Sequence, residues 1–250
     1  RIVDLYAKEF LRLGHTVNIM ASAGSNNYEG TLYIHKAPSK KWLSRAYRKI
    51  IFQFQSLYAA RNCDFIFNHG RFDYLESLLR LGKPIIQYQH NGLDSKQIKM
   101  MESKVNKRFK LICISKDQVS EFKTTFKTKV IHNFVDTNYY PFSEKGKGYL
   151  AFLGRLTKNK GVDSAIKIAK LSQKKLKIAG IIPQNNEDRE FFENEVKPDI
   201  GNNLIEFIGK VNDSEKKKFL GEADALLCPG LWKEPCAVTV SESFSCGTPV

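Results

Sequence analysis

Several familiar patterns are missing from this chain of 250 residues, and each absence disfavours a class of protein. No run of 18 or more apolar residues occurs, so the sequence predicts no membrane-spanning helix. The five cysteines are scattered and include no Cys-x-x-Cys pair, which favours a reduced, cytoplasmic setting over disulfides or zinc. No signal-peptide pattern opens the chain, and a start at Arg1 without Met predicts a fragment.

Two glycine-rich nucleotide-binding motifs are also absent. Neither the dinucleotide fingerprint Gly-x-Gly-x-x-Gly nor the Walker A order Gly-x4-Gly-Lys-Ser/Thr occurs. A nucleotide site in this chain therefore has to be built from other residues.

Acidic residues are scarce in the first part of the chain. Residues 1–150 contain 25 Lys and Arg against 12 Asp and Glu, a net charge of +13. Residues 151–250 contain 15 against 14, a net charge of +1. The asymmetry predicts an anionic partner for the first part: lipid headgroups, an acidic acceptor or nucleic acid.

One predicted helix, residues 39–62, contains no acid at all. Its predicted buried stripe consists of Leu43, Tyr47, Ile50, Ile51, Phe54, Leu57 and Tyr58. Its basic side chains are Lys41, Arg45, Arg48 and Lys49. A basic amphipathic helix can lie on an anionic membrane, and a solvated helix face over an ordinary core is an equally good interpretation.

Strands and helices alternate along the whole chain. The strand candidates are residues 17–20, 31–36, 64–68, 84–90, 111–114, 148–153, 176–180, 204–209 and 225–228. The helix candidates are residues 1–13, 39–62, 72–81, 162–171, 187–196 and 214–220, with further helices opening near Ser95, Ser115 and Pro235. This alternation predicts an α/β fold with two doubly wound parallel sheets, joined by a polar linker at 138–148.

Two carboxylates, Glu234 and Glu242, flank the predicted start of the last helix. Pro235 suits a first helical turn and Gly247 a helix end. A helix start offers N–H groups to phosphate, and carboxylates accept hydrogen bonds from hydroxyls. A sugar nucleotide, with hydroxyls on both sides of a diphosphate, fits this arrangement. Two solvated acids near a helix start are the alternative.

A second signal lies at residues 154–161, Gly-Arg-Leu-Thr-Lys-Asn-Lys-Gly. This loop follows a predicted strand, where a doubly wound sheet places its ligand. Arg155 can bind phosphate through its guanidinium fork, and Lys160 adds a point charge. In isolation, two solvated loop cations are as good an interpretation.

These motifs resemble the donor site of the family-4 retaining glycosyltransferases, which have the GT-B fold. The matching segments are Glu-x7-Glu before Ser-Phe-Ser-Cys-Gly-Thr-Pro-Val, and Gly-Arg-x4-Lys-Gly. The resemblance implies two Rossmann-like domains, both incomplete here. Residues 1–140 would form the acceptor-side domain without its first strand, which would precede Arg1. Residues 141–250 would form the sugar-nucleotide domain without its C-terminal part.

The resemblance also implies an activity and the residues that carry it. A hexosyltransferase-type enzyme would move a sugar from a nucleotide-diphospho-sugar to an acceptor hydroxyl with retention. Glu234 would hold the donor sugar and Glu242 the ribose. His90, which follows a predicted strand, would face the sugar across a cleft, although a structural histidine is an equal alternative. The remaining donor-binding residues would be Gly154, Arg155, Lys160, Gly209 (near the base), Ala237 and Val238.

The sequence departs from the family pattern at several positions. Cys236 and Ala237 stand where an aromatic residue and Gly are usual, and Phe134 replaces a Gly. Alanine is tolerated at 237 if its φ is negative, because phosphate binding there uses backbone N–H groups. Asp-x-Asp, a metal-holding motif of many glycosyltransferases, is absent. We therefore expect no metal and no cofactor, with cations and a helix start stabilising the diphosphate.

Two rival functions fit parts of the sequence. A sugar-nucleotide epimerase shares the GT-B fold, but it needs acid and base residues that the first part does not supply at its predicted strand ends. A non-catalytic module that binds sugar nucleotides or nucleic acid would explain the basic and aromatic residues of 41–58, but no RNA-binding signature is present. We expect a cytoplasmic enzyme, either free or associated with the inner face of the membrane. A lipid-linked molecule and a polysaccharide are the two candidate acceptors, and we expect no specific nucleic acid.

Overall fold

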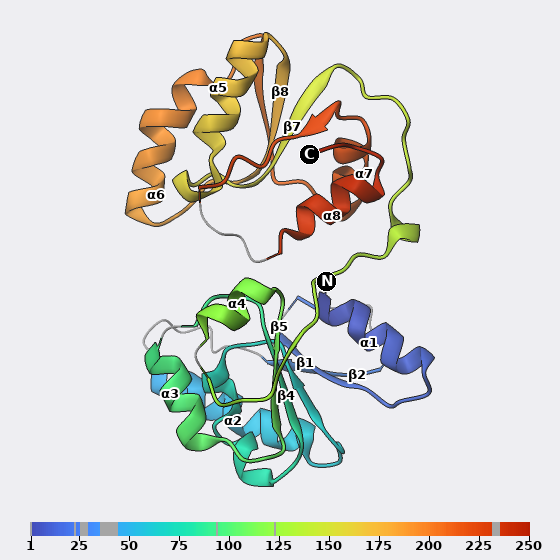
Figure 1. Cartoon of the computed structure of the whole chain (residues 1–250), viewed down its shortest axis with the longest axis vertical. Coiled ribbons are helices and arrows are strands. Elements are labelled where there is room, and N and C mark those ends of the chain that lie inside the picture. The colour runs from blue at the N-terminus through green and yellow to red at the C-terminus, as the bar shows by residue number, and fades with distance from the viewer. Residues whose placement is uncertain are drawn as a thin grey trace. The chain divides into compact units, whose positions relative to one another are not determined.

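The computed structural model describes residues 2–22, 24–25, 30–35, 45–93, 95–122, 124–231 and 236–250. Side chains at 45, 46 and 48 lie outside this description. The chain divides into two compact units, Arg1–Asn133 and Phe134–Val250. Each unit is an α/β domain with parallel strands (Figure 1), as the sequence predicts.

The first unit contains a four-stranded parallel sheet and a separate parallel strand pair. The order in the sheet is β3-β4-β5-β6, and the pair is β1-β2. The strands are β1 (Asn18–Ser22), β2 (Thr31–His35), β3 (Ile66–Asn68), β4 (Ile85–Gln89), β5 (Phe109–Cys113) and β6 (Thr128–Val130). The helices are α1 (Ile2–Arg12), α2 (Arg45–Ala60), α3 (Ser95–Lys104) and α4 (Lys116–Glu121).

The predicted helix at 72–81 is wrong. The chain there makes two 3-10 turns, Phe72–Leu75 and Leu78–Leu81. Ser77 separates them, and its N–H donates to Oε1 of Gln53 in α2 over 2.9 Å. An N–H that donates to a side chain of another helix cannot form the intrahelical hydrogen bond to the carbonyl four residues earlier. A segment of ten residues has few such hydrogen bonds, so the loss of one prevents a continuous α-helix.

The predicted buried stripe of α2 is also wrong in part. Four of its members are exposed, with exposed fractions from 47% to 69%: Tyr47, Ile50, Phe54 and Tyr58. Their spacing places them along one side of the helix. The opposite side supplies the buried residues, among them Ser56 and Ala60. Leu43 of the predicted stripe lies outside the described residues.

The second unit contains a four-stranded parallel sheet in the order β10-β7-β8-β9. Its strands are β7 (Tyr149–Arg155), β8 (Lys175–Ile181), β9 (Ile205–Gly209) and β10 (Ala225–Leu226). Its helices are α5 (Val162–Ser172), α6 (Asn186–Phe191), α7 (Asp213–Gly221) and α8 (Val238–Ser245). Figure 1 shows α5 and α6 on one side of this sheet and α7 and α8 on the other. This is the doubly wound arrangement.

The strand order places a topological switch point between β7 and β10. From β7 the chain adds β8 and then β9 on one side, whereas β10 pairs with β7 on the other side. In open parallel sheets, ligands bind outside the carboxyl ends of the strands at such a point. The segments that follow β7 and β10 are therefore the candidate ligand-binding segments of this unit.

The boundary between the units differs from the predicted division at 140/141. Tyr140 lies in a buried cluster of the second unit, together with Tyr149 and Phe219. Ser143 N donates to Cys246 O over 2.9 Å, and Lys147 N donates to Glu222 O over 2.7 Å. The predicted linker at 138–148 therefore packs on the second unit, because its aromatic residue and backbone groups have partners there.

Candidate functional site

The loop after β7 contains the predicted diphosphate cations. Arg155 is the last residue of β7 and is exposed, while Lys160 ends a 3-10 turn, Lys158–Lys160. Gly161 follows and precedes the first turn of α5. The loop thus presents two cations beside the positive end of a helix dipole, an arrangement suited to an anion.

This loop contacts the segment that follows β10. Gly161 has a φ of 73°, and a Cβ there would lie 2.3 Å from Pro229 O. Leu231 N donates to Asn159 O over 3.2 Å. Only glycine fits at position 161, since a side chain would force the two loops apart. The fold thereby brings both predicted donor segments of the second unit to the switch point.

The segment after β10 leads into α8. Glu234 lies outside the described residues, as does Pro235. Ala237 is the N-cap residue of α8 with a φ of −73°, so the condition for tolerating alanine there is met. No side chain caps this end of α8, and Val238 opens its first turn. Gly247 follows the helix end, as predicted.

Glu242 lies one turn inside α8 and is almost completely buried. Its Oε1 accepts a hydrogen bond from Nζ of Lys216 in α7 over 3.0 Å. The side chain of Lys216 is itself only 14% exposed, and it also lies 3.2 Å from Oδ1 of Asp213. Lys216 thus places a positive charge beside a buried carboxylate.

Gly209, the predicted neighbour of the base, is the last residue of β9. This strand is separated from β7 by β8, so Gly209 lies further along the same sheet edge than Arg155. The chain continues from Gly209 to Asn212, which caps α7 through Glu215 N over 2.9 Å. The loop after β9 therefore leads directly into α7, the helix that carries Lys216, and α7 packs on α8.

In the first unit, His90 directly follows β4, as predicted, and His69 follows the neighbouring strand β3 in the same way. Nδ1 of His69 lies 3.1 Å from Nε2 of His90. Tyr88 stacks on His69 with 5.0 Å between ring centroids, and Phe67 lies 4.4 Å from the same ring. The two histidines form the polar end of an aromatic cluster.

Burial lowers the pKa of both histidines. The pKa of His69 falls to about 4, because its surroundings disfavour the charged ring and His90 adds repulsion. The pKa of His90 is lowered by burial as well. Both rings are therefore neutral at pH 7, and each neutral ring has one N–H donor and one acceptor nitrogen.

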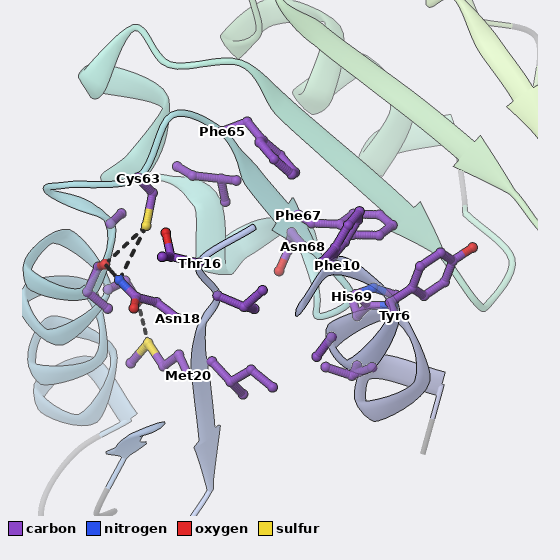
Figure 2. A pocket seen from close by; sticks show the side chains of 18 of the residues that line it. Tyr6, Phe10, Thr16, Asn18, Met20, Cys63, Phe65, Phe67, Asn68 and His69 are labelled. Atoms are coloured by element: carbon purple, nitrogen blue, oxygen red, sulfur yellow. Dashed lines mark hydrogen bonds between the residues drawn. The ribbon is translucent and has the colours of Figure 1, made fainter. Parts of the chain in front are cut away.

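A cavity of about 540 Å³ adjoins this cluster (Figure 2). Tyr6 and Phe10 of α1 line it from one side, and Asn18 and Met20 of β1 from the other. Residues 65–69, in and next to β3, line it as well, as do residues of α2. Among the described residues, β1 and β3 each have a strand neighbour on one side only.

Within the described residues, no three His, Cys, Asp or Glu side chains gather in a way that could hold a metal ion. None of the helices described there is long and apolar enough to cross a bilayer.

Two residues of the site, His69 and Lys216, were not predicted from the sequence. His69 gives the same signal as His90, a histidine directly after a predicted strand, and it could have been found. Lys216 is one of three consecutive lysines, and nothing in the sequence distinguishes it from Lys217 and Lys218. Only the packing of α7 on α8 selects it.

Two sequence-family models match the chain and together cover nearly all of it. "Glycosyltransferase Family 4" matches residues 1–139. "Glycosyl transferases group 1" matches residues 141–250. Neither describes an epimerase or a nucleic-acid-binding module. A comparison with curated proteins found no relative.

Known structures share the fold at low sequence identity. AviGT4, a glycosyltransferase involved in avilamycin A biosynthesis, is 22% identical, with a TM-score of 0.66 over 100% of this chain and 68% of that chain. Sucrose-phosphate synthase from Thermosynechococcus elongatus is 13% identical, with a TM-score of 0.75 over 98% and 74%. HepE from Anabaena, in complex with UDP-glucose, is 14% identical, with a TM-score of 0.64 over 93% and 79%. The shared architecture is the GT-B fold.

Proposed function

Because the chain belongs to glycosyltransferase family 4, we propose that it moves a sugar from a nucleotide-diphospho-sugar to an acceptor hydroxyl with retention and without a metal ion. The observation that carries the donor assignment is the switch point between β7 and β10. Both predicted donor segments of the second unit adjoin it and contact each other through Asn159 and Leu231. HepE, which shares the fold, was crystallised with UDP-glucose.

In this proposal, the loop after β7 binds the diphosphate. Arg155 and Lys160 supply positive charge, and the starts of α5 and α8 supply backbone N–H groups, at Ala237 and Val238 in α8. Gly154 leaves room beside the loop, since a Cβ there would come no closer than 3.8 Å to any neighbour. Cations of this kind stabilise a leaving diphosphate, and removal of one typically lowers the rate about 10²- to 10³-fold.

The hydroxyls of the donor are bound by carboxylates and by His90. Glu242 accepts hydrogen bonds from the ribose, Glu234 from the sugar, and the base lies near Gly209. His90 contacts the sugar. The roles of Glu234 and His90 and the retention of configuration rest on the family resemblance. A supporting feature for Glu242 is Lys216, whose Nζ donates to one oxygen of this carboxylate and places a positive charge beside it.

The test of transfer and of metal independence uses one reaction. The chain is incubated with a panel of sugar nucleotides, beginning with UDP-glucose, together with candidate polysaccharide and lipid-linked acceptors that carry free hydroxyls. Release of the nucleoside diphosphate is measured in excess EDTA. Undiminished turnover in EDTA, with product of unchanged anomeric configuration by proton NMR, supports the proposal. Activity that is lost in EDTA and restored by Mg²⁺ or Mn²⁺ contradicts metal independence. Conversion of the donor into its epimer would instead support the rival enzyme class.

We further propose that α2 places the first unit on an anionic membrane surface. The predicted basic face included Lys49, but Nζ of Lys49 lies 2.6 Å from Oε2 of Glu76, so this cation is already paired. Lys41 and the side chains of Arg45 and Arg48 lie outside the described residues. The support comes from the exposed side of α2 described above, which carries Tyr47, Ile50, Phe54 and Tyr58.

An exposed apolar helix side in a strongly basic domain suits the boundary between headgroups and acyl chains. Aromatic residues are favoured at this boundary because they have an apolar body and a polar edge. The cation of Arg61 lies 3.8 Å from the ring centroid of Tyr58, which adds positive charge at the end of this side. A membrane position would bring the enzyme to a lipid-linked acceptor. Steering of an acidic soluble substrate is the alternative use of the same charge.

A further inference from the structure

A second histidine, His69, lies beside the one that the proposed chemistry uses. His69 and His90 end adjacent parallel strands, and their facing nitrogens, Nδ1 and Nε2, are 3.1 Å apart. Their rings are nearly parallel, with 27° between planes and 5.4 Å between centroids. Both belong to the carboxyl edge of the sheet, where ligands bind.

Buried amides hold the two loops in place. Asn68 Nδ2 donates to Gln87 Oε1 over 2.6 Å, and Gln87 Nε2 donates to Gly70 O over 3.0 Å. Gln89 Nε2 donates to Asn91 O over 3.0 Å. The residue after each histidine, Gly70 or Asn91, therefore has its carbonyl held by the side chain of a glutamine in β4. The distance between the rings is set by the fold before any ligand arrives.

The short distance allows only one hydrogen between the two rings. Two hydrogens would repel, and two bare nitrogens would repel as well. Both rings are neutral at pH 7, as shown above by the direction of their pKa shifts. If Nδ1 of His69 donates, Nε2 of His90 accepts, and each ring then carries its hydrogen on Nδ1. If Nε2 of His90 donates, each ring carries its hydrogen on Nε2. The two rings must share one tautomer.

We propose that His69 is a positioning residue that couples the tautomer of His90 to its own. The hydrogen of His69 then decides whether the remaining nitrogen of His90, Nδ1, donates or accepts a hydrogen bond. A donor-sugar hydroxyl facing His90 would meet a nitrogen whose role changes only when both rings change together. This role in donor binding rests on the proposed function, whereas the coupling between the two rings does not.

The coupling is measured on the whole chain by long-range proton–nitrogen NMR after labelling the histidines with nitrogen-15. The spectra contain no sugar nucleotide, so a failure of the transfer reaction leaves this test unaffected. His132 is the internal reference, because its Nδ1 lies 2.8 Å from Ile114 O and must carry the hydrogen. We expect His69 and His90 to show the same tautomer as each other at pH 7.5.

Two variants separate positioning from packing. His69→Phe keeps an aromatic ring against Tyr88 but has no nitrogen, so we expect His90 to show mixed tautomers. His69→Asn returns a polar atom near the Nδ1 position, and we expect one tautomer to dominate again. His132 should be unchanged in both variants. Opposite tautomers in the wild-type pair, or a His90 signal that is the same in His69→Phe, would overturn the proposal. The wild-type spectrum decides even if a variant does not fold.

Discussion

At the scale of single residues, the second unit depends on a cation that accompanies a buried carboxylate. Lys216→Met removes one partner of Glu242, whose side chain is only 4% exposed. We expect the free energy of unfolding to fall by about 3 kcal/mol, because removing one member of a buried ion pair is strongly destabilising. Urea unfolding measures this change. Trp232 reports on the second unit when the only other tryptophan, Trp42, is replaced by Phe.

Controls for this prediction lie in the same two helices. Lys218→Met, at an exposed position of α7, should change stability by less than about 0.5 kcal/mol. Adding Glu242→Gln to Lys216→Met should recover part of the loss, because the buried charge is then gone. An undiminished loss in the double variant would show that Lys216 acts through its packing instead.

His69 predicts a pH dependence of stability in the first unit. Its pKa is about 4 in the folded chain and about 6.5 when unfolded. As pH falls, the unfolded chain binds the proton first, so the stability from neutral His69 is complete above about pH 6.5. It is lost progressively between pH 6.5 and 4, by up to about 3 kcal/mol.

The measurement is urea unfolding at pH 7.5, 6 and 5, with Trp42 as reporter in a Trp232→Phe background. His69→Phe has no proton to bind at this position, so its stability should fall less over the same interval. Parallel pH profiles for the two proteins would contradict the prediction. The first unit's carboxylates with lowered pKa values, Glu9, Glu76 and Glu102, titrate below the three pH values measured.

At the scale of elements, the pairing of β7 with β8 requires a bare backbone at one register position. Gly180 faces Gly154, and a Cβ at Gly180 would lie 1.8 Å from Gly154 O and 2.8 Å from a methyl carbon of Leu156. We expect Gly180→Ala to destabilise the second unit by about 1–3 kcal/mol, because one strand must move away from the other. Gly154→Ala has no neighbour within 3.8 Å and should be nearly neutral in the same urea titration.

The sequence predicts elements well where a short apolar run is bounded by turn residues. The strands at β4, β5, β7, β8 and β9 were predicted within a few residues. Most of their residues are buried or half-buried, so each strand leaves a largely apolar run in the sequence that can be recognised without knowledge of its neighbours. The segment 72–81 has a helical pattern, but the N–H of Ser77 donates to the side chain of Gln53 in α2. A hydrogen bond between distant parts of the chain cannot be predicted from the local apolar pattern.

The helix α2 shows the same limit for burial. Its apolar residues cover more of its circumference than the unit buries, so periodicity identified the helix but not its inward side. Tyr47 and Phe54 are exposed although they share the predicted stripe with Leu57. In the candidate site, the loops carrying Arg155, Lys160 and His90 were visible as local motifs. Lys216 could not be predicted, because only the packing of α7 on α8 distinguishes it from its neighbours, whereas His69 followed a predicted strand and was overlooked.

At the scale of the whole molecule, charge is distributed unequally between two domains of similar architecture. Residues 1–150 carry a net charge of +13 and residues 151–250 only +1. Net charge does not determine the fold, since both units build parallel sheets, but it governs non-specific attraction to anionic surfaces. The exposed side of α2 lies in the basic unit. Apolar exposure and positive charge together make a membrane position testable.

We expect the protein to co-sediment with phosphatidylserine vesicles at low salt and to dissociate as salt is added. Each Lys or Arg near such a surface contributes about 1 kcal/mol. Because Lys49 is already paired with Glu76, the four-residue change Lys41/Arg45/Arg48/Lys49→Glu removes about 3 kcal/mol of attraction. This corresponds to roughly a 10²-fold weaker partition onto the vesicles. The double variant Ile50→Ser/Phe54→Ser should weaken the part of vesicle binding that persists at higher salt, because salt does not screen the contact of apolar side chains with the membrane.

The matched control changes four exposed lysines elsewhere in the same unit, Lys96/Lys99/Lys107/Lys110→Glu. It alters the net charge of the unit by the same amount, so a purely global attraction would fall equally in both variants. Docking through α2 instead requires the α2 variant to lose much more binding than the control. Equal losses, or a wild-type protein that ignores the vesicles at low salt, would contradict membrane docking. The basic charge would then be assigned to steering of an acidic substrate, because that role needs no particular face of the unit.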